Sequence, residues 1–148
     1  MEFKEISAEN YHECIKLKVF PNQEDFVASN SFSLLEAHYE GNCYPLGIYV
    51  DGVMVGFLMY SHNLAGTEYP IDSWWMQRLM IDHQHQRKGY GKEAINKLLD
   101  FIKAQGFCNE FYTSAEPANA GAIMLYEKLG FVRTGEIVEG EIVLKIVF

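Results

Sequence analysis

Hydrophobic and polar positions follow two different periods along the chain, and the changes of period predict its strands and helices. Alternating or continuous apolar runs are typical of strands, and apolar positions three or four apart are typical of a buried helix face. The strand pattern occupies residues 3–6, 46–50, 53–60, 73–81, 110–114 and the two segments on either side of Glu139-Gly140. The helical pattern occupies residues 8–18, 89–105 and 118–129.

Local signals add another helix and a tight turn. Ser33 and Glu36 have the spacing of a capping box, in which each side chain bonds a free backbone amide at a helix start. We therefore expect a helix to begin at Ser33, after a polar and irregular stretch over 22–31. Asp51-Gly52 suits a type I′ turn between two strands, and a loop is expected over 62–71.

The order of these elements is strand, helix, helix, three strands, helix, strand, helix and two strands. A meander of antiparallel strands followed by a strand–helix–strand unit predicts an α/β (α+β) fold, in which helices cover both faces of a mixed sheet. No repeat, linker or low-complexity tract interrupts the 148 residues, so we expect a single domain over 1–148.

Composition excludes several classes of protein. Hydrophobic residues make up 49% of the chain and charged residues 22%, as in ordinary soluble globular proteins. No apolar run approaches the ~18 residues of a membrane helix, and residues 1–5 do not resemble a signal peptide, so a cytoplasmic protein without membrane contact is expected. The three cysteines lack C-x-x-C spacing, and His83 and His85 have no third ligand at a suitable spacing. Neither a disulfide framework nor a metal site is therefore expected.

The formal net charge of -8 argues against a nucleic-acid partner, because such proteins bind phosphates with Lys and Arg. An acidic surface either concentrates cationic ligands or serves solubility alone, and the charge by itself does not separate these alternatives.

One segment reverses this acidic character, and it lies between a predicted strand ending at Ile81-Asp82 and a predicted helix starting at Gly89 or Tyr90. The segment is Gln86-Arg87-Lys88-Gly89-Tyr90-Gly91, and Lys92 follows it. A helix N-terminus has unpaired amides and a partial positive charge, so it attracts anions such as a pyrophosphate. Glycines let the backbone approach a phosphate closely. The segment therefore predicts an anion site.

Two other anion-binding motifs compete for this segment. The P-loop string G-x-x-x-x-G-K-[ST] does not occur in the chain. Gly89 to Ala94 does match the dinucleotide fingerprint G-x-G-x-x-G/A. However, the polar stretch 82–88 separates it from its strand, and residues 92–148 are too few to complete a doubly wound sheet. We therefore disfavour the dinucleotide reading.

With a second motif downstream, the sequence resembles the GNAT superfamily, the GCN5-related N-acetyltransferases. The acetyl-CoA motif Q/R-x-x-G-x-G/A is matched by Gln86, Gly89 and Gly91. The pattern N-x-x-A-x-x-L-Y-x-K-x-G-F is matched over residues 119–131. The resemblance covers the whole chain and implies the GNAT fold, a central sheet of about seven strands with four main helices and two splayed parallel strands.

The resemblance also implies which residues bind acetyl-CoA as a cosubstrate, without a metal. The strand before the loop would pair with the pantetheine arm, the loop amides would hold the pyrophosphate, Asn119 would contact the pantetheine amides, and Lys128 would lie near the adenosine end. The residues assigned to acetyl-CoA in this way are Leu79, Met80, Ile81, Gln86, Arg87, Lys88, Gly89, Tyr90, Gly91, Lys92, Asn119, Ala122, Tyr126 and Lys128.

Tyr126 is the residue that the resemblance assigns to catalysis. In this family an amine attacks the thioester directly, and a phenol near the sulfur can protonate the departing thiolate. The amine must first lose a proton, since an ammonium has no lone pair. Glu116 and Asp72, at strand ends, are candidate bases, and backbone carbonyls could instead steer the amine.

Similarity to a narrower branch, the bacterial spermine/spermidine and diamine acetyltransferases, bears on the substrate. Matching strings include Asn22-Gln23-x-x-Phe26-Val27-Ala28-Ser29, Ser33-Leu34-x-Glu36-Ala37 and Pro45-Leu46-Gly47-Ile48-Tyr49. Arg87 is a departure, because close relatives often have Gly there. A polycation would meet carboxylates and aromatic faces, and the expected substrate-binding residues are Gln23, Glu24, Glu36, Tyr39 and Trp75.

Other functions compatible with the motifs are acetylation of a peptide N-terminus, an amino acid or an antibiotic, and non-catalytic acyl-CoA sensing. A homodimer through the closing strands is expected only by analogy with relatives.

Overall fold

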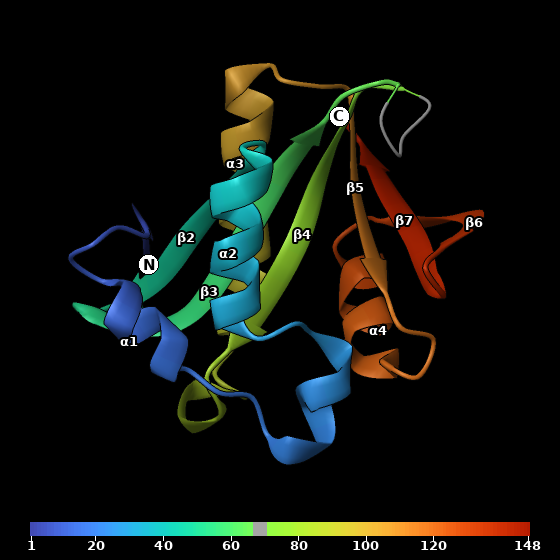
Figure 1. Cartoon of the computed structure of the whole chain (residues 1–148). Coiled ribbons are helices and arrows are strands. Elements are labelled where there is room, and N and C mark those ends of the chain that lie inside the picture. Colours follow the sequence, from blue (N-terminus) through green and yellow to red (C-terminus); the bar gives the residue numbers. More distant parts are fainter. Residues whose placement is uncertain (67–70) are drawn as a thin grey trace.

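The computed structural model describes residues 1–66 and 71–148, and its elements follow the predicted order (Figure 1). The strands are β1 Glu2–Glu5, β2 Cys43–Val50, β3 Val53–Asn63, β4 Ser73–Ile81, β5 Glu110–Ala115, β6 Val132–Val138 and β7 Glu141–Val147. The helices are α1 Tyr11–Lys16, α2 Asn30–Glu40, α3 Tyr90–Gln105 and α4 Ala120–Lys128, with 3-10 helices η1 Pro21–Phe26 and η2 His83–His85.

All seven strands form one sheet in the order β1-β2-β3-β4-β5-β7-β6. Neighbouring strands are antiparallel except for β4 and β5, which are parallel because α3 connects them. The predicted mixed sheet with helices on its faces is confirmed. In the described part of the chain, no helix is long and apolar enough to span a membrane.

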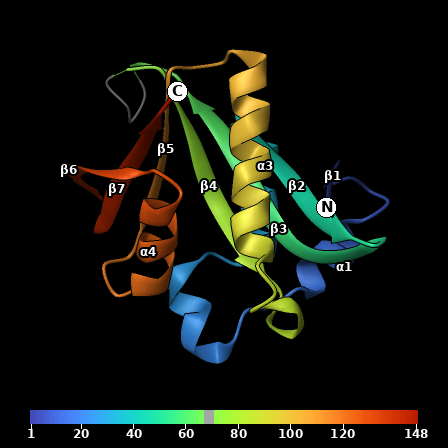
Figure 2. The ribbon, with the colours of Figure 1, turned by 180° about the vertical axis from the view of Figure 1, so that it is seen from behind.

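Two apolar clusters lie on opposite faces of this sheet. Helix α3 lies behind the sheet in Figure 1 and in front of it in Figure 2, and its stripe Ala94, Ile95, Leu98, Leu99 and Ile102 is fully or almost fully buried. Residues of α4 share that cluster, which also contains Phe111 and Leu144. Helices α1 and α2 cover the other face, where Cys14, Phe57 and Met59 are buried.

Two tight turns have the backbone that their sequences predict. Asp51 and Gly52 have φ values of 50° and 80°, and Glu139 and Gly140 have 51° and 80°. Positive φ at both central residues defines the type I′ turn, whose twist matches that of the strands it joins. The hairpins β2–β3 and β6–β7 follow from these turns.

Several predicted boundaries were wrong. Helix α2 begins at Asn30 rather than Ser33, because the Ser29 side chain accepts a hydrogen bond from Phe32 N and caps the helix. Ser33 lies inside the helix, buried, and its hydroxyl donates to the Ser29 carbonyl. The first helix, α1, is shorter than 8–18, and η1 occupies much of the stretch expected to be irregular. The expected loop over 62–71 begins after Asn63, and its residues 67–70 lie outside the described part.

Candidate active site

A gap opens in the middle of the sheet where β4 and β5 stop pairing. Their parallel pairing joins residues 74–76 to 111–113; beyond these, β4 continues beside β3 and β5 beside β7. The β3–β4 register shifts between Met59 and Tyr60, at the start of the gap, and such bulges bend a strand. At residues 79–81, one edge of β4 pairs with β3. The other edge faces the gap and has no strand partner among the described residues.

The loop from β4 to α3 turns sharply into a helix start. Arg87 and Gly89 have left-handed φ values of 63° and 80°, and Gly89 is the N-cap. Glu93 N donates to Gly89 O in the first turn of α3, so the amides of residues 90–92 precede the helical hydrogen-bond ladder. These amides and the side chains of Arg87 and Lys92 lie along the cleft wall. The arrangement suits an anion.

The motif glutamine Gln86 does not extend toward the solvent. Its side-chain amide nitrogen donates to Ile81 O at 3.0 Å and to Gln23 Oε1 at 2.9 Å, and Gln23 Nε2 donates back to Gln86 Oε1 at 3.2 Å. This reciprocal amide pair joins η1 to the β4–α3 loop. These hydrogen bonds hold η1 against the anion loop.

Tyr126 lies on α4 at the bottom of the gap and is 8% exposed. Burial, with a smaller effect of the Glu141 charge and an opposing hydrogen bond with Thr113, raises the pKa of Tyr126 to about 12. The phenol is therefore protonated at neutral pH. Asn119 caps α4, its side chain accepting from Ala122 N at 3.3 Å, and this bond fixes the start of the helix that carries Tyr126.

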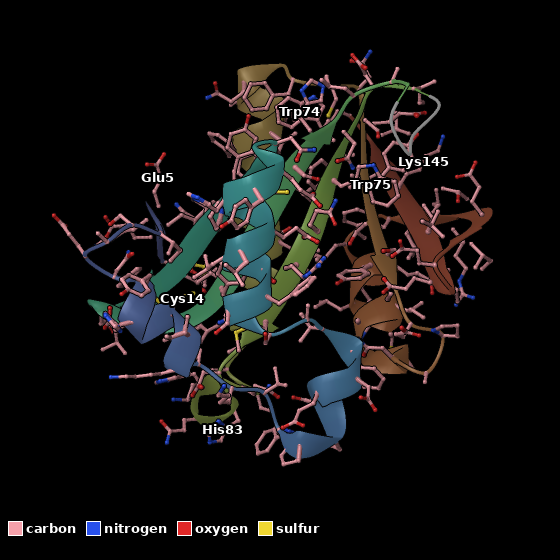
Figure 3. All side chains as sticks on the ribbon, in the orientation of Figure 1. Glu5, Cys14, Trp74, Trp75, His83 and Lys145 are labelled. Atoms are coloured by element: carbon pink, nitrogen blue, oxygen red, sulfur yellow. The ribbon has the colours of Figure 1, made fainter. Side chains whose placement is uncertain are left out.

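Carboxylates gather at the other end of the same cleft, beside β4 and α2. Glu36 and Glu40 of α2 line it, and Glu36 pairs with Arg78 at 3.2 Å; Glu24 lines the cleft from η1. Trp75 is 8% exposed, donates its indole N–H to Ser73 Oγ at 2.8 Å and stacks on Tyr112 at 5.1 Å between ring centroids. In Figure 3 the labelled Trp75 lies beside β5, away from the labelled Trp74.

One continuous cleft of about 1480 Å³ joins the anion loop, the gap and this acidic end. It is large enough for two substrates to lie in contact, since ligand pockets are typically about 300–1,000 Å³.

The comparisons with known proteins agree with this geometry. A model of the acetyltransferase (GNAT) family matches residues 3–131. The chain is also 31% identical over 141 residues to a spermine/spermidine N(1)-acetyltransferase of Bacillus subtilis, covering 93% of this chain and 91% of that protein. The chain belongs to the acetyltransferase (GNAT) family. A spermidine N(1)-acetyltransferase of Vibrio cholerae is 34% identical over 82 residues, 52% of this chain and 47% of that protein.

Solved structures share this GNAT fold. The PaiA N-acetyltransferase of Thermoplasma acidophilum in complex with coenzyme A has a TM-score of 0.70 at 15% identity, covering 99% of this chain and 98% of the other. A domain from Methanocaldococcus jannaschii reaches a TM-score of 0.76 at 15% identity, covering 99% and 97%. At these identities the likeness concerns the fold.

Most residues that the GNAT motifs pointed to lie along one cleft. Those that line it are Leu79, Met80, Ile81, Gln86, Arg87, Gly89, Tyr90, Gly91, Lys92, Asn119, Ala122 and Tyr126 of the residues expected to bind acetyl-CoA, and Gln23, Glu24, Glu36 and Trp75 of those expected to bind the amine. Lys88, Lys128 and Tyr39 do not belong to the described lining, and Tyr39 is 81% exposed on α2. Trp74 faces the other side of the sheet, stacked between His62 and Phe107.

The two candidate bases also lie outside the described cleft lining. Asp72 precedes β4 at the end where β4 and β5 still pair, and its carboxylate accepts a hydrogen bond from Ala65 N at 2.7 Å. This carboxylate braces a loop instead of facing the gap. Glu116 follows the last residue of β5, and the structure does not bring it to the lining.

Sequence reasoning missed three further features of this family site. Asp82 is buried and accepts hydrogen bonds from Lys18 N and Gln84 N, which fixes the start of the anion loop; an Asp directly after a strand was the available signal. Arg78 forms an ion pair with Glu36, and none of the sequence motifs includes this arginine. Glu141 and its partner Ser114, at 2.8 Å, line the cleft from β7 and β5.

Glu36, Glu40 and Cys43 bring their ligand atoms within 4.8 Å of one another, a group that no spacing rule indicated. Burial, and then the charges of Glu36 and Glu40, raise the pKa of Cys43 to about 11, so the thiol keeps its proton at neutral pH. Arg78 already pairs with Glu36, so one carboxylate of this group is engaged in an ion pair.

Proposed function

We propose that this chain transfers the acetyl group of acetyl-CoA to a primary amine of a polyamine, spermidine or spermine, by direct attack in a ternary complex. The observation that carries the proposal is the single cleft with cations and free amides at one end and carboxylates at the other. A cosubstrate that carries phosphates and a cationic acceptor can enter such a cleft from opposite ends and meet at the gap.

The cofactor half fits acetyl-CoA. The amides at the start of α3 and the side chains of Arg87 and Lys92 would hold the pyrophosphate. The unpaired edge of β4 at residues 79–81 would hydrogen-bond the amides of the pantetheine arm as an added strand does. The acetyl group and sulfur would then lie near Tyr126.

The acceptor half favours a polycation over a simple amine. Glu24 and Asp25 of η1 and Glu40 of α2 line the cleft, and Trp75 adds an aromatic wall. Several carboxylates spread along a channel attract a ligand with several charges more strongly than one with a single charge. The two curated relatives named above, which act on spermine or spermidine by their names, support the same class.

Tyr126 would act as the acid. The amine nitrogen forms a bond to the acetyl carbon as the C–S bond breaks, and the phenol gives its proton to the departing thiolate. Its position in the gap and its protonated state at neutral pH support this role.

The test measures CoA release from acetyl-CoA with a panel of acceptors: spermine, spermidine, putrescine, butylamine, lysine, a peptide with a free N-terminus and an aminoglycoside. We expect the highest kcat/KM for spermine or spermidine and a KM for them that rises with salt, since screening weakens attraction between charges. Butylamine is the matched control, because it offers the same primary amine without further charges. Equal kcat/KM for butylamine and the polyamines would refute the substrate assignment, and mass and NMR analysis of the product would identify the acetylated nitrogen.

A further inference from the structure

The two faces of β5 carry different chemistry at the gap. Thr113 is paired with Leu144 and faces the cluster that contains Tyr126. Ser114 is paired with Val143 and faces the opposite side of the sheet, because side chains alternate along a strand. Both residues line the cleft, so the cleft passes β5 on both sides.

A carboxylate is held on the Ser114 side. Glu141 is the first residue of β7, and its Oε1 accepts a hydrogen bond from Ser114 Oγ at 2.8 Å. Among the described residues, Ser114 is the side chain that bonds this carboxylate, so its second oxygen is open to the cleft. The charge of Glu141 is felt by the Tyr126 phenol from the other side.

We infer that Glu141 is the carboxylate that receives the proton of the incoming ammonium, and that Ser114 is the residue that positions it. The inference rests on the proposed acetyl transfer. In a site with this arrangement, the amine reaches the gap from the acceptor face with the base beside it, and the thiolate leaves toward the acid on the opposite face.

The protons and electron pairs balance as follows. Glu141 takes one proton from the ammonium, and the freed lone pair forms the N–C bond while the C–S electron pair moves to sulfur. Tyr126 gives its proton to that sulfur. The second nitrogen proton leaves to the solvent, from which the phenol regains one, and Glu141 later releases its own.

Other charges near Glu141 do not replace it in this role. Glu136 on β6 and Glu139 in the β6–β7 turn line the same cleft, but among the described residues Glu141 is the one of these three whose carboxylate is hydrogen-bonded to β5, the strand that borders the gap. Lys145, labelled in Figure 3 on the same strand, is bound to Glu110 at 2.8 Å. Tyr126 on α4 feels the charge of Glu141 and already serves as the acid in the proposed reaction.

The experiment compares Glu141→Gln with wild type across pH, using the best acceptor amine of the panel. Gln keeps the oxygen that Ser114 bonds, so the fold is expected to stay intact. We expect kcat/KM for the amine to fall about 100-fold near pH 7.5, the low end of what a general base contributes. The deficit should shrink as pH approaches the pKa of the amine, about 10, because more amine then arrives as the free base.

Two further readouts separate a base from a structural role. Trifluoroethylamine, an amine that is already neutral at the assay pH, should react with the variant almost as fast as with wild type. The thermal shift given by acetyl-CoA should be unchanged. Glu127→Gln is the control, because Glu127 makes the same charge change on the outer surface of α4, where it pairs with Arg133. If Glu141→Gln has no cooperative melting transition, Ser114→Ala replaces it in the experiment. We then expect kcat/KM for the amine to fall less than in Glu141→Gln, and the deficit to shrink in the same way as pH rises.

Wild-type rates in Glu141→Gln, or a deficit of equal size at every pH, would overturn the assignment of Glu141 while leaving acetyl transfer in place. Absence of CoA release by the wild-type protein with every amine would overturn the proposed function and this inference with it.

Discussion

Replacing Tyr126 with Phe removes one hydroxyl from a site where the structure predicts both a catalytic and an electrostatic effect. The phenol is 8% exposed, and burial chiefly raises its pKa from 10.0 to about 12. At neutral pH the variant should lose at most about 1 kcal/mol of stability, the value of one hydrogen bond. Its kcat should fall about 10²- to 10⁴-fold, because general acid catalysis contributes that much, while acetyl-CoA affinity stays nearly unchanged.

The same substitution has a second consequence at alkaline pH. Because the folded pKa lies above the unfolded one, the unfolded phenol ionises first, and wild-type stability is lost as pH rises from 10 toward 12. The full shift corresponds to roughly 3 kcal/mol, of which about 1.4 kcal/mol is lost by pH 11. Phe cannot ionise. The variant should therefore lose about 1.4 kcal/mol less than wild type between pH 8 and pH 11.

Urea unfolding at pH 8 and pH 11, with CoA release at pH 8, measures both effects. Tyr112→Phe is the matched control, because its pKa is also raised to about 12, by burial and by Glu110, and it lies outside the described cleft lining. That control should keep wild-type kcat. An unchanged kcat in Tyr126→Phe would refute the acid role, and an alkaline stability loss equal to that of wild type would refute the burial argument.

Three further experiments test how the site is held. Gly56→Ala should cost about 1–3 kcal/mol of unfolding free energy in urea, because a Cβ there would lie 2.5 Å from Met80 O and force β3 from β4. Asp82→Ala should leave two backbone donors unpaired, Gln84 N in the anion loop and Lys18 N after α1, lowering stability by about 1–3 kcal/mol and weakening the acetyl-CoA thermal shift. A double-mutant cycle of Gln23→Ala and Gln86→Ala should give a coupling of about 0.5–1.5 kcal/mol in unfolding free energy; additive effects would contradict the reciprocal amide pair.

The strands, the two type I′ turns and α3 could be predicted because their determinants are local. Asp51-Gly52 and Glu139-Gly140 fix their own backbone, and the α3 stripe repeats at helical spacing. The start of α2 could not be predicted from the sequence, because Ser29 and Ser33 are both good capping residues. Ser33, on the inner side of the helix, is 0% exposed, and this packing decided the choice.

The site residues, too, could be predicted where their position depends on local sequence and not where it depends on distant contacts. Those inside a contiguous motif, such as Gln86 and Asn119, lie on the cleft because the motif and the helix start are one local unit. The Gln23–Gln86 pair joins residues 63 apart, and Ser114–Glu141 joins residues 27 apart. Sequence spacing contains no information on such contacts; the second of them depends on β7 lying between β5 and β6.

The alternation of side chains along β5 would also let the proposed acid and the proposed base act on one thioester without neutralising each other. A phenol and a carboxylate on the same face would share one proton through a direct hydrogen bond. Here the alternation along β5 places Thr113 beside Tyr126 and Ser114 beside Glu141, so the strand itself separates the two groups. Because β7 runs antiparallel to β5 and starts at Glu141, this carboxylate lies at the open end of the gap, where β4 has diverged. In the proposed mechanism, a proton would leave the amine on one face while another reaches the sulfur on the other.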